Sequence, residues 1–383
     1  MTTPTKSTRP GRVEGLFVDE NFTVRRGTLE FSERIERVEG SEESRPQRPD
    51  ELLWVPGFVD LHNHGGNGGG FPNADYEHCL AAARFHRSQG TTTLLASMVS
   101  DTRDELCFRA ELLARLAAEG EIAGIHMEGP FIAADKCGAQ DPSRIVPGDP
   151  DFFRAVINAA QGYLRSITFA PETEGADELL GVCAEHGIIA SLGHTVADYQ
   201  TTMDVIAKAR ELGVTVTGTH LFNAMPSLHH RAPGPVAALL NAAERGQVAV
   251  ELIADGVHLD DATVDLAYSP HAFAVTDAMA AAGMADGAYE LGPLAVTVSG
   301  GVARVGTGAI AGGTSTLAQQ FTRFAARHGV GRAVAFTSTT AADVMGEEGL
   351  GRIGAGKHAN LVGLNAQGEP VRVVVAGREF TSN

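Results

Sequence analysis

The sequence predicts an α/β fold: a (β/α)8 TIM barrel with a small β-sandwich domain formed by both chain ends. Short apolar runs alternate with helical patterns through the middle of the chain, eight such runs can be distinguished, and both ends are strand-like. Eight strands with intervening helices over roughly 290 residues have the size and rhythm of a TIM barrel. We therefore expect residues 1–56 and 350–383 in the small β domain and residues 57–349 in the barrel.

The barrel elements are expected in a regular order. The eight strands begin near Gly57, Thr91, Ile122, Leu164, Ile188, Val214, Val248 and Ala272, and helical patterns cover 101–118, 150–161, 176–186, 198–212, 234–245 and 317–328. Thr102 and Glu105 have the spacing of a capping box, and glycines stand where helices should end, at positions 90, 120, 187, 213 and 246. A doubly wound open sheet is the alternative, but no GxGxxG or GxxxxGK[ST] motif follows a first strand, which weakens its nucleotide-binding form.

The two chain ends are expected to pair in one β domain. Strand-like segments cover 12–18, 28–31 and 35–38 near the start and 360–364 and 371–377 near the end. The polar stretch 40–50 is expected to be an exposed loop. A hairpin-like insert is expected at 289–309, after the eighth barrel strand, and the glycine-containing run that follows, at 311–317, can approach a ligand through its backbone.

Composition excludes several classes of function. The net charge of -17 argues against general binding to nucleic acids or anionic membranes. The first ten residues are polar and no run of about 18 apolar residues occurs, so we expect neither a signal peptide nor a membrane span. The four cysteines (Cys79, Cys107, Cys137 and Cys183) are far apart, which favours reduced thiols and a cytoplasmic protein.

Side chains that can bind metal ions stand at the ends of five expected strands. They are His62 and His64 on the first, Glu128 on the third, His194 on the fifth, His220 on the sixth and Asp277 on the eighth. A single strand histidine is more often a hydrogen-bonded core residue. In a TIM barrel, however, all strand ends converge on the face that carries active sites. Four histidines and two carboxylates at that face suit Zn²⁺ or a similar divalent ion.

Several sequence runs together resemble one enzyme family. The run PGFVDLHNHG at 56–65 resembles the opening signature of the amidohydrolase superfamily. Five further runs narrow the resemblance: HMEGPF at 126–131, LGHT at 192–195, THLFNAMP at 219–226, IADGVH at 253–258 and VTDA at 275–278. The six runs, taken together and in this order, resemble those of the N-acetylglucosamine-6-phosphate deacetylase family. The similarity extends from about Pro56 to Asn360.

The resemblance implies a chemistry and a metal centre. It implies hydrolysis of N-acetyl-D-glucosamine 6-phosphate to D-glucosamine 6-phosphate and acetate, in amino-sugar metabolism. Glu128, His194 and His220 would hold one divalent ion, Zn²⁺ by preference, with Fe²⁺, Mn²⁺ or Co²⁺ as alternatives. Some relatives lack the two histidines of the first strand, and their retention as His62 and His64 implies a second ion. An ion activates water, and Asp277 would act as general base and then as general acid.

The resemblance also implies contacts to a phosphorylated amino sugar. Arg231 would bind the phosphate across the interface of a homodimer, which suits a guanidinium fork. Asn223 and Ala224 would lie near the phosphate, and His258 would contact the substrate. Gln140 stands where many relatives have a histidine and can donate a hydrogen bond without carrying charge. The nearby Cys137 is expected to be an incidental exposed thiol.

Other functions remain open from the residues alone. A dihydroorotase-like enzyme or an N-acyl-amino-acid deacylase would need an arginine for a carboxylate and usually a bridging lysine after the fourth strand. That strand ends in TFAPE at 168–172, with no lysine. A non-catalytic binding protein on the same fold is expected to lose Asp277 or metal ligands, and this chain keeps them all. No GxSxG motif indicates a serine nucleophile.

Overall fold

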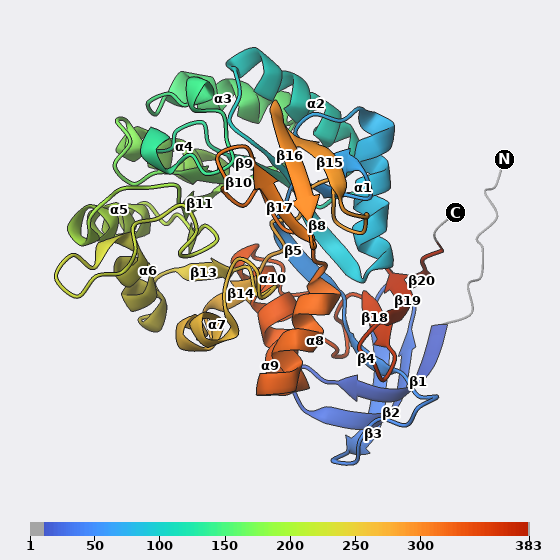
Figure 1. Ribbon diagram of the computed structural model, residues 1–383. Helices are drawn as coiled ribbons and strands as arrows, with labels where there is room; N and C mark the ends of the chain where they lie inside the picture. Colours follow the sequence, from blue (N-terminus) through green and yellow to red (C-terminus); the bar gives the residue numbers. More distant parts are fainter. Residues whose placement is uncertain (1–10, 382–383) are drawn as a thin grey trace.

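The computed structural model describes residues 11–381, and its centre is a closed barrel (Figure 1). The eight parallel strands follow one another in sequence order: β5 (Phe58–Asn63), β8 (Thr91–Met98), β9 (Gly124–Glu128), β10 (Leu164–Phe169), β11 (Ile189–Leu192), β12 (Val216–Gly218), β13 (Ala249–Leu252) and β14 (Ala272–Ala274). A bridge between Asn63 and Ala278 and a hydrogen bond from Asp277 N to His62 O, at 2.9 Å, join the first strand to the last. The TIM barrel prediction is therefore confirmed, and the open-sheet alternative is wrong.

Helices surround the barrel in the expected order. They are α1 (Tyr76–Ser88), α2 (Arg103–Ala118), α3 (Pro150–Ala159), α4 (Ala176–His186), α5 (Tyr199–Glu211), α6 (Gly234–Glu244), α7 (Asp261–Ala267) and α8 (Leu317–His328). Six were predicted from periodicity, whereas α1 and α7 were not. Thr102 accepts a hydrogen bond from the backbone N of Glu105 at the start of α2, while a complete capping box forms at the start of α8, between Thr316 and Gln319. The five glycines expected at helix ends all have positive φ.

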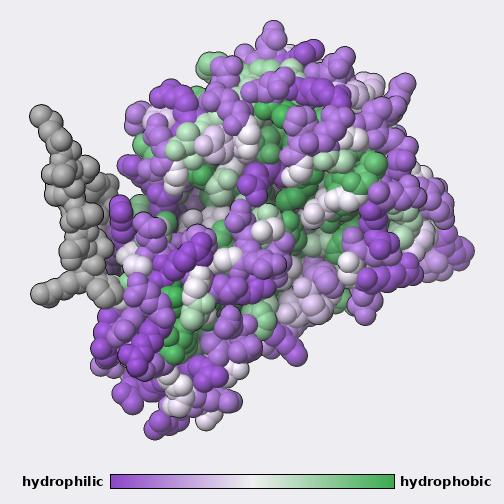
Figure 2. Space-filling view, turned by 180° about the vertical axis from the view of Figure 1, so that it is seen from behind, coloured by the Kyte–Doolittle hydropathy of each residue, from purple (hydrophilic) through white to green (hydrophobic). Residues whose placement is uncertain are grey.

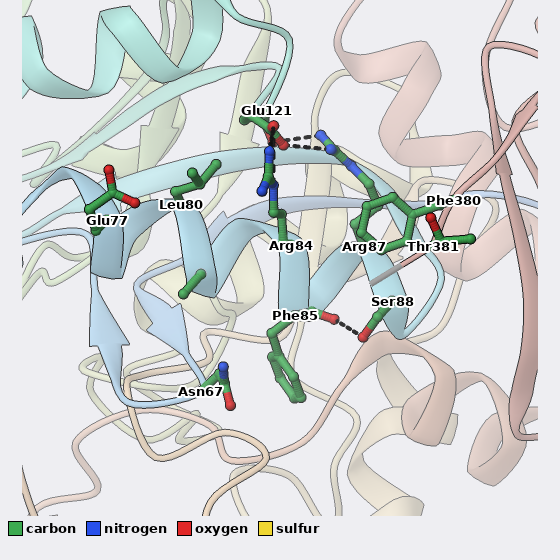
Figure 3. A pocket seen from close by; sticks show the side chains of 11 residues that line it. Asn67, Glu77, Leu80, Arg84, Phe85, Arg87, Ser88, Glu121, Phe380 and Thr381 are labelled. Atoms are coloured by element: carbon green, nitrogen blue, oxygen red, sulfur yellow. Dashed lines mark hydrogen bonds and ion pairs between the residues drawn. The ribbon is translucent and has the colours of Figure 1, made fainter. Parts of the chain in front are cut away.

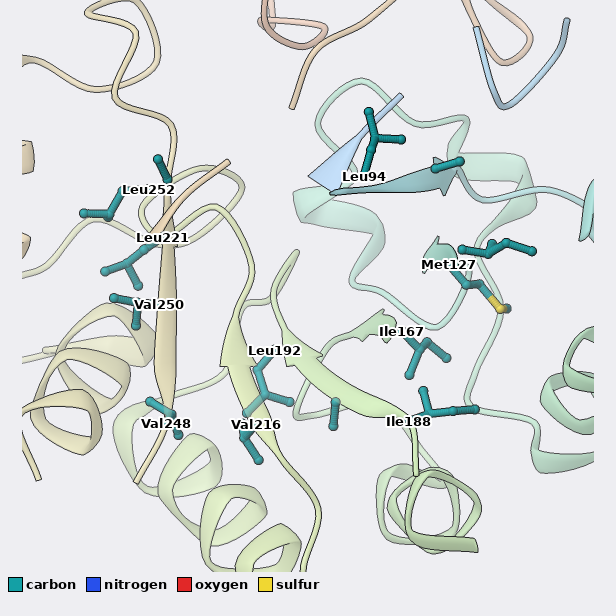
Figure 4. Packing of buried hydrophobic residues seen from close by; sticks show 14 of the residues in the cluster. Leu94, Met127, Ile167, Ile188, Leu192, Val216, Leu221, Val248, Val250 and Leu252 are labelled. Atoms are coloured by element: carbon teal, nitrogen blue, oxygen red, sulfur yellow. The ribbon is translucent and has the colours of Figure 1, made fainter. Parts of the chain in front are cut away.

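The barrel core has an outer and an inner part. Apolar side chains from consecutive strands, among them Leu94, Ile167 and Val250, pack in the main core with the surrounding helices (Figure 4). Inside the barrel, Val59 and Phe273 pack with Ala341 and Met345. The latter belong to a continuous helical stretch, formed by α9 (Val330–Val334), the π-helix η3 (Ala335–Thr339) and α10 (Thr340–Val344) with its C-cap Met345, which closes one end of the barrel. The other end is left for polar groups.

Both chain ends form one small β domain, as predicted. Its seven strands are joined in one hydrogen-bonded sheet of order β20-β19-β18-β4-β1-β2-β3. They are β1 (Gly11–Val18), β2 (Val24–Phe31), β3 (Ile35–Glu42), β4 (Leu53–Pro56), β18 (Leu361–Leu364), β19 (Pro370–Val375) and β20 (Arg378–Glu379). Figure 1 shows the blue N-terminal strands beside the red C-terminal ones. Trp54, Phe17 and Leu361 pack in a separate core of this domain, and the expected loop at 40–50 begins only after β3.

Smaller elements extend from the loops of the barrel. The insert expected as a hairpin is a three-stranded antiparallel sheet of β15 (Gly287–Leu291), β16 (Leu294–Ser299) and β17 (Val302–Val305), which we call the flap. Val296 and Val298 of the flap pack with Val99 and Ala139 from two barrel loops. The remaining short elements are β6 (Gly65–Gly66), β7 (Gly69–Gly70), η1 (Ala134–Lys136) and η2 (Pro142–Arg144).

The surface is largely hydrophilic. Figure 2 shows that hydrophilic residues cover most of the face opposite to the view of Figure 1, with apolar residues gathered in recesses between them. None of the helices in residues 11–381 is long and apolar enough to cross a membrane.

Candidate active site

The six side chains expected to bind metal lie at one end of the barrel. His62 and Glu128 are within the last two residues of their strands, and His64 follows β5 directly. His194, His220 and Asp277 come two or three residues after their strands and have φ values of 47°, 25° and 47°. Left-handed φ values are uncommon for residues with a side chain and cluster at functional sites. At these positions the backbone turns away from the strand while the side chain stays directed at the barrel axis.

One group of ligand atoms surrounds Glu128. His194 Nε2 lies 3.0 Å and His220 Nε2 lies 3.1 Å from Glu128 Oε1, and the two ring nitrogens are 3.1 Å apart. All three side chains are nearly buried. The three atoms thus come together from the ends of strands β9, β11 and β12.

A second group involves the first strand. His62 Nε2 and His64 Nε2 are 3.1 Å apart. Asp277 Oδ1 lies 3.6 Å from the first nitrogen and 3.2 Å from the second. Glu128 Oε2 lies 3.2 Å from His64 Nε2, and Glu128 Oε1, which faces the first group, also lies 3.5 Å from His62 Nε2. Glu128 therefore contacts ligand atoms of both groups.

Hydrogen bonds at the far side of the rings decide which nitrogen carries the proton. His194 Nδ1 donates to the carbonyl oxygen of Lys136 at 2.7 Å, and His64 Nδ1 donates to that of Ser97 at 3.2 Å. Because a carbonyl only accepts, each neutral ring keeps a bare lone pair on Nε2. These lone pairs face the Nε2 atoms of His220 and His62, respectively, and the carboxylate of Glu128. Without a cation, this arrangement is repulsive. The donor set therefore fits a bound divalent ion.

The electrostatics of the same groups require positive charge. Burial alone would lower the pKa of His62, but Glu128 and the other carboxylates raise it well above its usual value. The pKa of His64 is raised against the same desolvation by hydrogen bonds to Asp277 and Glu128. Burial would raise the pKa of Glu128, yet His62 and His194 hold it well below its usual range. Burial would also raise the pKa of Asp277, but the hydrogen bond with His64 and the charge of His62 lower it. Without an ion, protons must balance these carboxylates.

A belt of polar side chains lies inside the barrel beneath the ligands. Hydrogen bonds connect Ser97, His126, Thr168, Thr219, Ser191 and Thr217 across five strands and the loop after β12. Burial and the nearby charge of His62 hold the pKa of His126 well below its usual value, so this ring is neutral. Glu251 on β13 is the carboxylate next to this belt, and it contacts two ligand residues. Sequence reasoning missed Glu251, because a single Glu inside an apolar strand carries no motif.

The ligand groups open into a cavity of about 230 Å³. Four residues expected to contact substrate line it: Gln140, Asn223, Ala224 and His258. Apolar residues of the flap and of the loops around it form another part of the lining, namely Val99, Leu291, Ala309, Ile310 and Ala311, and Gly312 also takes part. Ala311 and Gly312 are the first two residues of the run 311–317, for which an approach to a ligand was expected. The contribution of Leu291 could not be foreseen, because it depends on how the flap packs.

Two polar side chains are oriented towards the cavity by neighbours. Asp255 Oδ2 accepts a hydrogen bond from His258 Nδ1 at 2.8 Å, which leaves His258 Nε2 at 3.9 Å from Asp277 Oδ2. Gln140 Oε1 accepts from the backbone N of Ser100 at 2.8 Å, while its buried Nε2 has no hydrogen-bond partner within residues 11–381. A buried donor without a partner is costly, so this amide is available to a ligand.

Arg231 does not line this cavity. It is exposed in the loop between β12 and α6, where its side chain contacts His230 Nε2 at 2.7 Å. Cys137 is partly exposed in the loop that carries Gln140. Two of the sequence-predicted site residues therefore do not line the cavity of their own chain: His62 is fully buried beside the other ligands, and Arg231 is exposed away from them.

A separate hollow of about 520 Å³ lies on the outer side of α1 (Figure 3). Its lining includes Arg84 and Arg87, which both form ion pairs with Glu121, at 2.7 and 2.6 Å. Burial alone would raise the pKa of Glu121, but the hydrogen bond from Arg84 and the charge of Arg87 lower it. Arg87 also lies over the ring of Phe380. These contacts tie the barrel to the C-terminal segment, so the hollow has a structural explanation.

Comparison with known proteins agrees with this geometry. Residues 53–380 match the model of the Amidohydrolase family. The solved N-acetyl-D-glucosamine-6-phosphate deacetylase of Mycobacterium smegmatis is 35% identical, with a TM-score of 0.88 over 98% of this chain and all of that one. The N-acetylglucosamine-6-phosphate deacetylase of Bacillus subtilis is 34% identical over 77% of each chain. An N-acetylgalactosamine-6-phosphate deacetylase of Escherichia coli O157:H7 is 30% identical over 87% of this chain and 88% of its own.

Proposed function

The chain belongs to the amidohydrolase family, and we propose that it hydrolyses N-acetyl-D-glucosamine 6-phosphate to D-glucosamine 6-phosphate and acetate. The observation that carries the proposal is the convergence of four imidazole rings and two carboxylates at the end of the barrel, beside one cavity. The two relatives at 34–35% identity bear the name of this activity. The family is metal-dependent, and the donor set of this chain suits such an ion.

Two ions are held by the ligand groups in this proposal. Glu128, His194 and His220 would hold the first, and His62 and His64 would hold the second together with Glu128 and Asp277. Imidazole and carboxylate donors favour Zn²⁺, and they also accept Fe²⁺, Mn²⁺ or Co²⁺. When bound, such an ion lowers the pKa of water towards about 7 and polarises a carbonyl.

Asp277 moves the proton. Its side chain is 14% exposed and lines the cavity. The lowered pKa of this carboxyl keeps it ionised at neutral pH. It accepts a proton from the attacking water and then donates it to the amide nitrogen, because the amine must leave as a neutral group.

Other residues hold the sugar. Gln140 Nε2, which lacks a partner within the described residues, donates to a hydroxyl or carbonyl oxygen of the substrate. His258 is fixed by Asp255, so its Nε2 points beside Asp277 and can bind close to the reacting amide. Asn223 and Ala224 line the cavity, and in the sequence they shortly precede Arg231.

The phosphate requires a cation that this cavity lacks. Neither Lys nor Arg is among the described residues that line it. A dianion in a chain of net charge -17 needs a local positive group. We propose that the chain forms a homodimer in which Arg231 of one subunit reaches the phosphate bound by the other, since this arginine is exposed in a loop next to Asn223 and Ala224.

The test of the proposed reaction is acetate release from the phosphorylated sugar by chain reloaded with Zn²⁺, compared with chain treated with a chelator. N-acetylgalactosamine 6-phosphate is tested in parallel because the relative from Escherichia coli O157:H7 bears that name. Dihydroorotate and N-acetyl amino acids represent the other amidohydrolase activities. Turnover of these, without acetate release from either sugar phosphate, contradicts the proposal, as does full activity in chelator.

Mixing experiments test the dimer. In a mixed dimer of Arg231→Ala and Asp277→Asn subunits, one site carries both lesions and the other carries none if the arginine acts on its partner. Activity should then return when the two inactive proteins exchange subunits. If mixed dimers form and activity does not return, Arg231 acts within its own subunit or not at all. A monomer in light scattering at assay concentration contradicts the arrangement directly.

The four cysteines support a cytoplasmic location, which we also propose. All are free in the structure, and Cys79 and Cys183 are buried. Burial raises the pKa of each of these two thiols to about 12, so they are unreactive. Unpaired cysteines are typical of reducing compartments, and fractionation of the native host tests the location.

A further inference from the structure

We propose that Glu251 is a positioning residue that aligns both groups of metal ligands at once. The inference rests on the proposed function, because it takes the ligand set from there. Glu251 lies on β13, one of the strands that contribute none of the six ligands, and is 3% exposed. Its carboxylate reaches sideways across the barrel interior to residues of the first and sixth strands.

One oxygen of Glu251 makes two hydrogen bonds. Oε2 accepts from His62 Nδ1 at 3.1 Å and from the backbone N of His220 at 3.0 Å. The other oxygen, Oε1, accepts from Ser191 Oγ at 3.4 Å. A single carboxylate therefore contacts a ligand of each group, on the side of each residue that faces away from the cavity.

The bond to His62 sets the state of its ring. A carboxylate only accepts, so Nδ1 of His62 must carry a proton, and in the neutral ring Nε2 is left as a lone pair. That lone pair faces His64 Nε2 and Asp277 Oδ1, where the second ion is expected. A carboxylate behind a ligand histidine also raises the basicity of the ring and fixes its orientation, which strengthens metal binding.

The bond to His220 fixes a turn of the backbone. His220 has φ of 25°, a conformation that neighbouring contacts must maintain. Glu251 Oε2 holds its backbone N, and the backbone N of Leu221 donates to the carbonyl oxygen of Glu251 at 2.8 Å. The side chain and the backbone carbonyl of Glu251 thus together determine where the ring of His220 lies relative to Glu128.

The surroundings of Glu251 argue against a purely structural ion pair. Within residues 11–381 its only ion-pair partner is His62, and its other side-chain contacts are neutral. A buried carboxylate without a fixed cation costs several kcal/mol by desolvation. The cost is offset if the positive charge is supplied by ions bound to His62 and His220. The position is therefore explained by the metal centre and not by the barrel.

The experiment is metal titration of chain stripped by a chelator, with Zn²⁺ and a competing chromophoric chelator, checked by elemental analysis. Glu251→Gln keeps the shape and an oxygen that can still accept from His220 N, but removes the charge behind His62. We expect the affinity for the ion that depends on His62 to fall about 10–100-fold, and that for the other ion to stay within about threefold. Thr217→Val is the matched control, because this buried belt residue contacts no ligand.

The same substitution made in a His62→Asn variant distinguishes a positioning role of Glu251 from a general loss of stability. If Glu251 acts through His62, then Glu251→Gln added to His62→Asn should change the affinity for the remaining ion by less than about threefold. Equal losses in both backgrounds, or an equal loss in Thr217→Val, overturn the inference. Wild-type chain that binds no ion contradicts the proposed function itself. Wild-type binding with unchanged affinity in Glu251→Gln contradicts only the role of Glu251.

Discussion

Replacement of Asp277 by Asn tests the chemical step most directly. The two side chains have the same shape, so the backbone contacts of residue 277 are kept, including the bond from its N to His62 O at 2.9 Å and the bond from Gly313 N to its carbonyl at 2.6 Å. The carboxylate oxygen that lies 3.2 Å from His64 Nε2 becomes an amide atom that cannot accept a proton from water. The variant therefore removes the base and leaves the cavity intact.

The expected loss follows from the role of the base. General base catalysis contributes about 10²–10⁴-fold, which is about 2.7–5.4 kcal/mol in activation free energy. We expect kcat to fall by that factor. Glu128 and the four histidines are unchanged, and the amide of Asn keeps one oxygen that can face an ion, so metal content should stay near the wild-type value and substrate should bind with similar affinity.

The assay combines three measurements on the same preparation: acetate release, metal content and calorimetric binding of N-acetylglucosamine 6-phosphate. If kcat stays within tenfold of wild type while the metal content is full, Asp277 is not the base. A matching loss of metal and of activity would instead assign Asp277 to ion binding. The combined measurements therefore distinguish the two roles that its position allows.

Three further predictions concern the ions, the phosphate and the fold. His62→Asn with His64→Asn should remove one ion and keep the other, and equal metal content in both proteins would contradict two sites. Arg231→Ala should raise KM for the phosphorylated sugar roughly tenfold to over a hundredfold, since a charged hydrogen bond contributes about 1.5–3 kcal/mol. Replacement of another exposed arginine, Arg245→Ala, should leave KM unchanged. An equal rise in KM for the unphosphorylated sugar in Arg231→Ala would refute the phosphate contact. The lowered pKa of Glu121 implies stability that is present above the unfolded value of about 4.3 and lost as pH falls through the folded value. Glu121→Gln should therefore cost about 1–2 kcal/mol at pH 7, discounted because one arginine partner is half exposed, and progressively less as the pH falls through the folded pKa of Glu121, as measured by urea unfolding.

The order and type of the main elements could be read from the sequence because barrel strands are buried on both faces. Such strands are continuous apolar runs, and glycines such as Gly187 mark where the preceding helix ends. Helix α1 was not predicted because its buried residues are small or polar, Cys79, Ala82, Ala83 and His86, and give a weak apolar pattern. Helix α7 has seven residues, too few for a helical period to be recognised.

The ligand set could also be proposed from the sequence, for a reason that lies in the fold. Parallel barrel strands all end on one face, so residue type and strand order suffice to bring His62, Glu128 and Asp277 into one candidate site. The exposed position of Arg231 and the gap in positive charge around the cavity needed the structure.

What the sequence by itself determined is the barrel, the domain of the two ends and the residues that stand at the strand ends. Only the tertiary structure decided which ring nitrogens face the cavity, that Leu291 of the flap lines it, and that Glu251 contacts His62 and His220. Those contacts join residues as many as 189 positions apart. They depend on barrel closure and on the register between strands, which set side-chain neighbours that no local pattern encodes.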